Sequence, residues 1–114
     1  MNTPLKYPEC TGWVMVTKDK LIDNSNACNY HIIEAKIVVN ADNSRSVSAY
    51  NGKFKTCCGL EIKHDASYVS NTAFLKEESD NFRIFLAKKQ NAGWEICGNC
   101  VRRFYKDVEQ LNCR

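Results

Sequence analysis

The chain has 114 residues, of which 44% are hydrophobic and 25% are charged, and its formal net charge is +3. This length allows one domain and excludes a second one of ordinary size, while the composition excludes disorder along the whole chain. No apolar run approaches the roughly 20 residues that span a membrane. We therefore expect a single domain over residues 1–114, with 1–11 loosely ordered because both prolines lie there, and no membrane partner.

The first half of the chain predicts antiparallel strands. Trp13–Thr17 is an apolar stretch that indicates a first strand. Ile32–Val39 is rich in β-branched residues and alternates apolar with charged positions, which predicts a half-buried strand. The turn-forming residues 40–44 then predict a hairpin in which Ser46–Tyr50 is the returning strand.

The second half predicts another hairpin and then a helix. A short helix is expected around Ala73–Glu78, followed by a strand over Phe82–Lys88 whose apolar residues alternate, and a returning strand over Trp94–Ile96. The last segment has apolar residues at spacings of three, four and three, which form one helical face: Val101, Phe104, Val108 and Leu111. The predicted fold class is α+β, with antiparallel strands and hairpins closed by a C-terminal helix.

Seven cysteines are the most informative feature of the composition. An odd number leaves one thiol over in a disulfide framework, and the N-terminal residues have no apolar signal-peptide core. Both observations favour a reducing compartment, in which cysteines bind metal or remain thiols. We expect an intracellular, cytoplasmic location, or a nuclear one in a eukaryote. A disulfide framework in an oxidising compartment is the alternative.

The sharpest motif is the Cys-x-x-Cys pair of Cys97 and Cys100, at the start of the predicted terminal helix. This spacing lets two thiolates bind one tetrahedral zinc ion, and the positive end of the helix dipole favours their ionised form. The motif resembles the second half of a treble-clef zinc site, in which a hairpin delivers Cys-x-x-Cys to a helix. The resemblance covers about Phe82 to Leu111 and concerns the fold, because treble clefs serve many functions.

Cys28 and His31 have the same chelating spacing and come just before a predicted strand. Together with Cys97 and Cys100 they would complete a Cys₃His zinc site, which is a known structural type. We therefore predict zinc as the cofactor, with Cys97, Cys100, Cys28 and His31 as its ligands.

Cys57 and Cys58 are reserve ligands. With Gly59 they resemble a zinc knuckle, but Lys55 stands where the knuckle has a cysteine. Adjacent residues of an extended chain point in opposite directions, so one of the pair at most is expected to replace Cys28 or His31. His64 is a weaker candidate, and the near-terminal Cys10 and Cys113 are expected to be incidental.

The enzyme classes that the sequence allows lack a site. Trp94 and the Cys97–Cys100 pair look like a thioredoxin signature, but thioredoxin-like domains place that motif early, and only fourteen residues follow Cys100 here. A thiol–disulfide redox function is therefore the least favoured interpretation. The sequence contains no glycine-rich phosphate loop, zinc-protease motif or paired-carboxylate motif. We expect no catalytic residues.

The predicted C-terminal helix also offers a surface for partners. Arg102, Arg103 and Lys106 project from it just beyond the proposed metal site, which allows zinc-dependent nucleic-acid binding as an alternative. Asp107 and Glu109 offset these cations on the same face, as on an ordinary solvated helix. The favoured interpretation is a small zinc-stabilised regulatory module that binds a protein partner.

Overall fold

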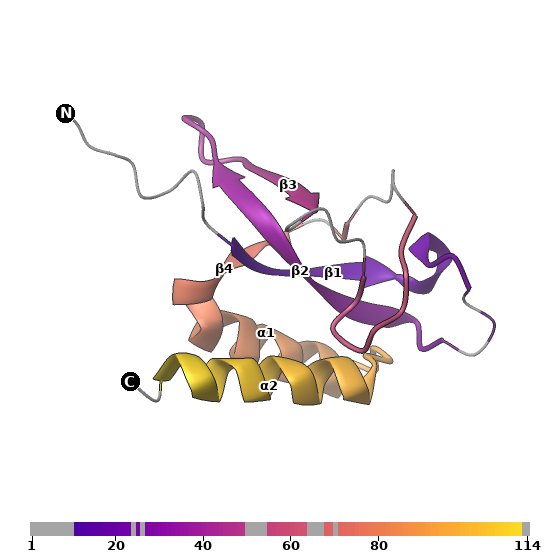
Figure 1. Cartoon of the computed structure of the whole chain (residues 1–114). Coiled ribbons are helices and arrows are strands. Elements are labelled where there is room, and N and C mark those ends of the chain that lie inside the picture. The colour runs from indigo at the N-terminus through magenta and orange to yellow at the C-terminus, as the bar shows by residue number, and fades with distance from the viewer. Residues whose placement is uncertain are drawn as a thin grey trace.

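The computed structural model of the chain describes residues 11–23, 25, 27–49, 55–63, 68–69 and 71–112. Within this part, a four-stranded antiparallel sheet in the order β3-β2-β1-β4 lies on two helices (Figure 1). The predicted α+β class is therefore confirmed. No helix of the described residues is long and apolar enough to cross a membrane.

Three of the predicted strands and the C-terminal helix are present. The elements in chain order are β1 (Thr11–Thr17), a 3₁₀ turn (Lys18–Lys20), β2 (Tyr30–Val39), β3 (Arg45–Ala49), β4 (Phe74–Leu75), a second 3₁₀ turn (Lys76–Glu78), α1 (Ser79–Asn91) and α2 (Gly98–Asn112). The predicted hairpin is formed by β2 and β3, in which Val39 pairs with Arg45 and Ala35 with Ala49. Tyr50, the expected end of this strand, lies outside the described residues.

The strand predicted over Phe82–Lys88 is wrong, because these residues belong to α1. Phe82 and Leu86 are fully buried, whereas Ile84 between them is 57% exposed. In a strand all three would share one face, but in a helix the four-residue spacing unites only the outer two. Cys97 is therefore preceded by a helix and a turn, not by the expected hairpin. The short helix expected around Ala73–Glu78 is instead strand β4 followed by a 3₁₀ turn.

Two apolar clusters cover the opposite faces of the sheet. Between sheet and helices, the fully buried Trp13 stacks with Phe82 and meets Phe104 edge-on, with ring centroids 6.4 and 4.8 Å apart. The other face buries a separate set that includes Val14, Val16, Leu21, Ile33, Ala35, Ile37 and Ile62. Strand β1 is thus buried on both sides. Val39, the last apolar residue of the alternating pattern in Ile32–Val39, is 44% exposed near the strand's end.

Three segments that are distant in sequence meet at the N-terminal end of α2 (Figure 1). The start of β2 is joined to the chain before α2, since the Tyr30 N–H donates to the Glu95 carbonyl (3.0 Å) and the Cys97 N–H to the Tyr30 carbonyl (2.9 Å). The segment 55–62 is joined to β2 by the Cys57 N–H, which donates to the Ile32 carbonyl at 2.7 Å. These backbone bonds determine which side chains face one another.

Candidate metal centre

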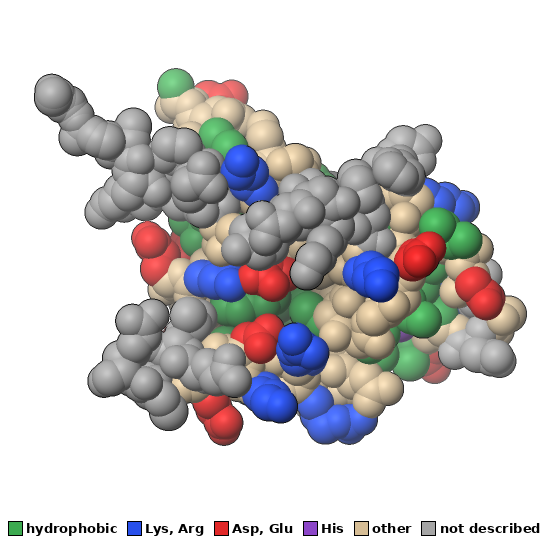
Figure 2. Space-filling model, in the orientation of Figure 1, with side chains coloured by type: hydrophobic (Ala, Val, Ile, Leu, Met, Phe, Trp, Pro, Cys, Tyr) green, Lys and Arg blue, Asp and Glu red, His purple; other side chains and the backbone are tan. Residues whose placement is uncertain are grey.

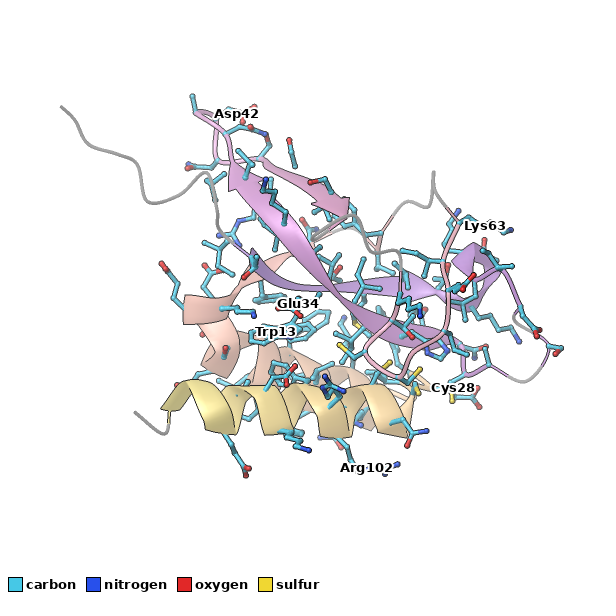
Figure 3. The ribbon with its side chains drawn as sticks, viewed as in Figure 1. Trp13, Cys28, Glu34, Asp42, Lys63 and Arg102 are labelled. Atoms are coloured by element: carbon cyan, nitrogen blue, oxygen red, sulfur yellow. The ribbon has the colours of Figure 1, made fainter. Side chains whose placement is uncertain are left out.

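At this junction lies a group of four side chains that could hold a metal ion: His31, Cys58, Cys97 and Cys100. Their ligand atoms all lie within 4.8 Å of one another. Figure 3 shows sulfur atoms gathered between the sheet and the N-terminal end of α2. His31, Cys97 and Cys100 are buried and Cys58 is half-buried, so most of the group is shielded from water.

Each ligand comes from an element with a local reason for its position. Cys97 directly precedes α2, and Cys100 lies in its first turn, so one helix start presents both sulfurs. Cys58 stands at the tip of a tight turn in which the Gly59 N–H donates to the Thr56 carbonyl at 2.9 Å. Gly59 has a φ of 98°, which a residue without a side chain adopts readily.

The distances inside the group suit tetrahedral coordination. His31 Nδ1 lies 3.6 Å from Cys58 Sγ and 3.7 Å from Cys100 Sγ. In a tetrahedral site with metal–sulfur bonds of about 2.3 Å and metal–nitrogen bonds of about 2.0 Å, bound nitrogen and sulfur atoms are about 3.5 Å apart. The two observed separations therefore leave room for an ion with little rearrangement.

The surroundings shift the pKa values of Cys58, Cys100 and His31 in different ways. Burial raises the pKa of the Cys100 thiol well above its usual range. Burial also acts to raise the pKa of Cys58, but hydrogen bonds from Thr56, Cys100 and Cys97 outweigh it and lower that pKa. Burial lowers the pKa of His31, so its ring is favoured in the neutral form that can bind a metal through a lone pair.

The structure places the predicted ligands as follows. It brings His31, Cys97 and Cys100 together, but the fourth member of the group is the reserve residue Cys58 instead of Cys28. Cys28 is exposed and lies beside the cluster in Figure 3. Partial loss of hydration and the neighbouring Cys97 thiol raise the pKa of Cys28.

Of the two adjacent cysteines in the turn, only Cys58 faces the group. Cys57 lines a pocket on the other side, and burial raises its pKa to about 12. The sequence carries one signal for this choice, which is the glycine after Cys58 that allows the tight turn. His64, Cys10 and Cys113 lie outside the described residues.

The cations predicted to contact a partner are exposed on α2. Arg103 donates a hydrogen bond to an Asp107 carboxylate oxygen at 3.4 Å, and Arg102 donates to the side-chain carbonyl of Asn99. Lys106 has no ion pair among the residues that the structure describes. The helix therefore presents a mixed surface in which part of the positive charge is locally offset.

No protein-family model, curated protein or solved structure matches this chain.

Proposed function

We propose that the chain is a small zinc-stabilised domain without catalytic activity that binds a protein partner. The observation that carries the proposal is the gathering of His31, Cys58, Cys97 and Cys100, whose ligand atoms lie within 4.8 Å of one another.

The donor set favours zinc. Three thiol groups and one imidazole match the softer transition metals, whereas magnesium and calcium prefer oxygen ligands. A Cys₃His set with tetrahedral spacing is a common structural zinc type. The buried His31 supports a ligand at this position, because its Nδ1 faces the sulfur atoms of Cys58 and Cys100. A metal bond at Nδ1 would compensate for part of the cost of burying this ring.

A structural role is favoured over a catalytic one. Catalytic zinc sites keep one coordination position open for water or substrate, whereas this group supplies four protein ligands. Those ligands come from β2, the turn around Cys58 and the start of α2, so the ion would cross-link segments that are far apart in sequence. The five described cysteines are free thiols, which supports a reducing, intracellular compartment.

A protein partner is preferred to nucleic acid. Arg103 is hydrogen-bonded to Asp107, and the exposed Glu109 follows on the same helix. These carboxylates would oppose a polyphosphate backbone, whereas a protein surface can match mixed charges.

Metal analysis of untagged protein tests the site. We expect one zinc per chain and seven titratable thiols after denaturation with a chelator. Cys58→Ser should lower zinc affinity by at least tenfold, since it removes a direct ligand, and Cys28→Ser is the matched control that should leave affinity within about threefold. Loss of zinc in Cys28→Ser with retention in Cys58→Ser would contradict the ligand set. Absence of metal, with thiols missing in pairs, would contradict the whole proposal.

A further inference from the structure

Cys28 is a fifth thiol beside a metal centre that needs only four ligands. It is not a member of the group of four. Its thiol nevertheless lies next to the thiol of Cys97, and its backbone lies next to the His31 ring. Figure 3 shows Cys28 at the edge of the sulfur atoms near the start of α2. A spare sulfur ligand is thus present within reach of two members of the group.

The position of Cys28 is fixed by the residues that follow it. The Lys18 N–H donates to the Asn29 carbonyl at 3.0 Å, and the Asn29 side-chain amide donates to the Glu95 carboxylate at 2.9 Å. Together with the bonds of β2 to the chain before α2, these contacts hold the start of β2 beside the segment that leads to Cys97. The neighbouring positions of Cys28 and Cys97 therefore follow from the fold.

The thiols around the centre differ in their access to solvent. Cys97 and Cys100 are buried, and Cys58 is half-buried. Almost no histidine surface is visible in Figure 2, in agreement with the burial of His31. Cys28 is the exposed one of the five cysteines in the part of the chain that the structure describes. A molecule that brings or removes a metal ion would therefore meet Cys28 first.

The chemistry of zinc gives such a thiol a use. Tetrahedral zinc can expand to five ligands during a reaction. A fifth thiol that already adjoins a ligand can bind the ion before that ligand leaves, so no step needs an ion with an empty position. As the Cys28 sulfur binds, its proton passes to water. The Cys97 thiolate takes up a proton when it is released, so the exchange is balanced.

From this arrangement we infer that Cys28 is the transfer ligand of the metal centre. It binds zinc only while the ion moves between the buried group and a carrier in solution. This inference rests on the proposed function. The carrier would be a zinc complex with thiolate ligands, because thiolates can replace those of this centre one at a time.

A ligand that contacts the ion only during transfer has a distinct kinetic signature. It lowers the barrier in both directions, so its removal should slow zinc uptake and zinc release by the same factor and leave the dissociation constant unchanged. Removal of a resting ligand would instead weaken zinc binding, and removal of a bystander would change neither rate.

The test measures both rates on the full chain by stopped flow. Uptake is followed from the zinc complex of glutathione, and release is followed in excess glutathione with a zinc-sensitive dye as the reporter. Cys28→Ser should slow both rates by about tenfold and change the dissociation constant by less than about threefold. Cobalt(II)-loaded Cys28→Ser should keep the wild-type absorption spectrum, because the resting ligands are unchanged.

Cys57→Ser is the matched control, since Cys57 is a nearby thiol that lines the hollow on the other side of the turn. It should leave both rates unchanged. Equal slowing in the two variants would overturn the inference, because any lost thiol in this region would then have the same effect. Wild-type rates in Cys28→Ser, or a loss of zinc affinity as large as the loss of rate, would also overturn it.

Metal content judges the proposed function separately. A zinc-loaded chain whose Cys28→Ser variant exchanges zinc at the wild-type rates loses this inference alone, whereas a chain that binds no zinc loses both.

Discussion

The N-terminal end of α2 and the rest of the helix are held in place by different interactions. Along most of its length, Phe104 and Val108 pack into a core of apolar and aromatic side chains that includes Trp13 and Phe82. At its N-terminal end, the helix meets thiols and a buried imidazole, whose hydrogen bonds among the described residues are few and mostly involve sulfur. Apolar burial is favourable in any solution condition near neutrality, whereas polar burial needs a compensating partner.

We therefore expect the aromatic core to stay folded without a metal ion. The junction of β2, the turn around Cys58 and α2 should need the ion to stay folded. The two regions adjoin, because Cys100 and Phe104 are one helical turn apart. A change in one region should therefore leave a distinct signature from a change in the other, and four measurements can separate them.

The largest effect is expected for Phe104→Ala. This ring is fully buried and packs edge-on against both Trp13 and Phe82. Removing it leaves a cavity, and the free energy of unfolding should fall by about 3–5 kcal/mol. Urea denaturation with and without zinc should give a similar loss in both states. If zinc affinity fell as much as stability, the two regions would be one cooperative unit and the comparison would fail.

Zinc removal is expected to have a comparable effect on the free energy, but a local one on structure. With free zinc at about a thousandfold over its dissociation constant, binding stabilises the folded state by about 4 kcal/mol. Hydrogen exchange should show that protection is lost near Cys58 and at the start of α2 but kept in β1. Uniform loss of protection, including the amides around Trp13, would show that the core also depends on the ion.

The response to pH should differ in sign between the two states. In the metal-free protein, burial raises the pKa of Cys100 above its usual range, so the folded state keeps this proton. That contribution to stability is present below about pH 8.5, the usual thiol pKa, and is lost as pH rises further. Zinc binding must displace this proton. The affinity for zinc should therefore rise about tenfold per pH unit for each proton released, which for one proton is about 2.7 kcal/mol between pH 6 and pH 8.

Competition with a coloured chelator at pH 6, 7 and 8 measures this rise, and urea denaturation of metal-free protein between pH 7 and 10 measures the opposite trend. Zinc affinity that is independent of pH would exclude thiols as ligands.

The smallest effect concerns a residue that supports Cys58. The Thr56 hydroxyl lies 3.1 Å from Cys58 Sγ and accepts the Leu60 N–H at 3.0 Å. Thr56→Val keeps the side-chain volume but removes both interactions, so zinc affinity should fall by about tenfold. The aromatic core should be unchanged by near-ultraviolet circular dichroism. Unchanged zinc affinity would show that the turn is held by its backbone alone.

Much of the fold was predictable because its local patterns were unambiguous. The alternation in Ile32–Val39 predicts a strand and fits no helix. The spacing of Val101, Phe104 and Val108 predicts a helix and fits no strand. Phe82–Lys88 lacked such clarity. A short run of apolar residues fits either period, and the exposure of Ile84, which decides between them, depends on where the sheet lies.

By itself, the sequence determined the Cys97–Cys100 pair at a helix start and the α+β class, because both depend on residues within a few positions of one another. Only the tertiary structure decided that Cys58 rather than Cys28 completes the group with His31. That choice depends on the backbone bond from Cys57 to Ile32, which joins two segments some 25 residues apart and orients the turn. Spacing along the chain measures local reach, whereas a metal centre is assembled from long-range contacts that no local pattern records.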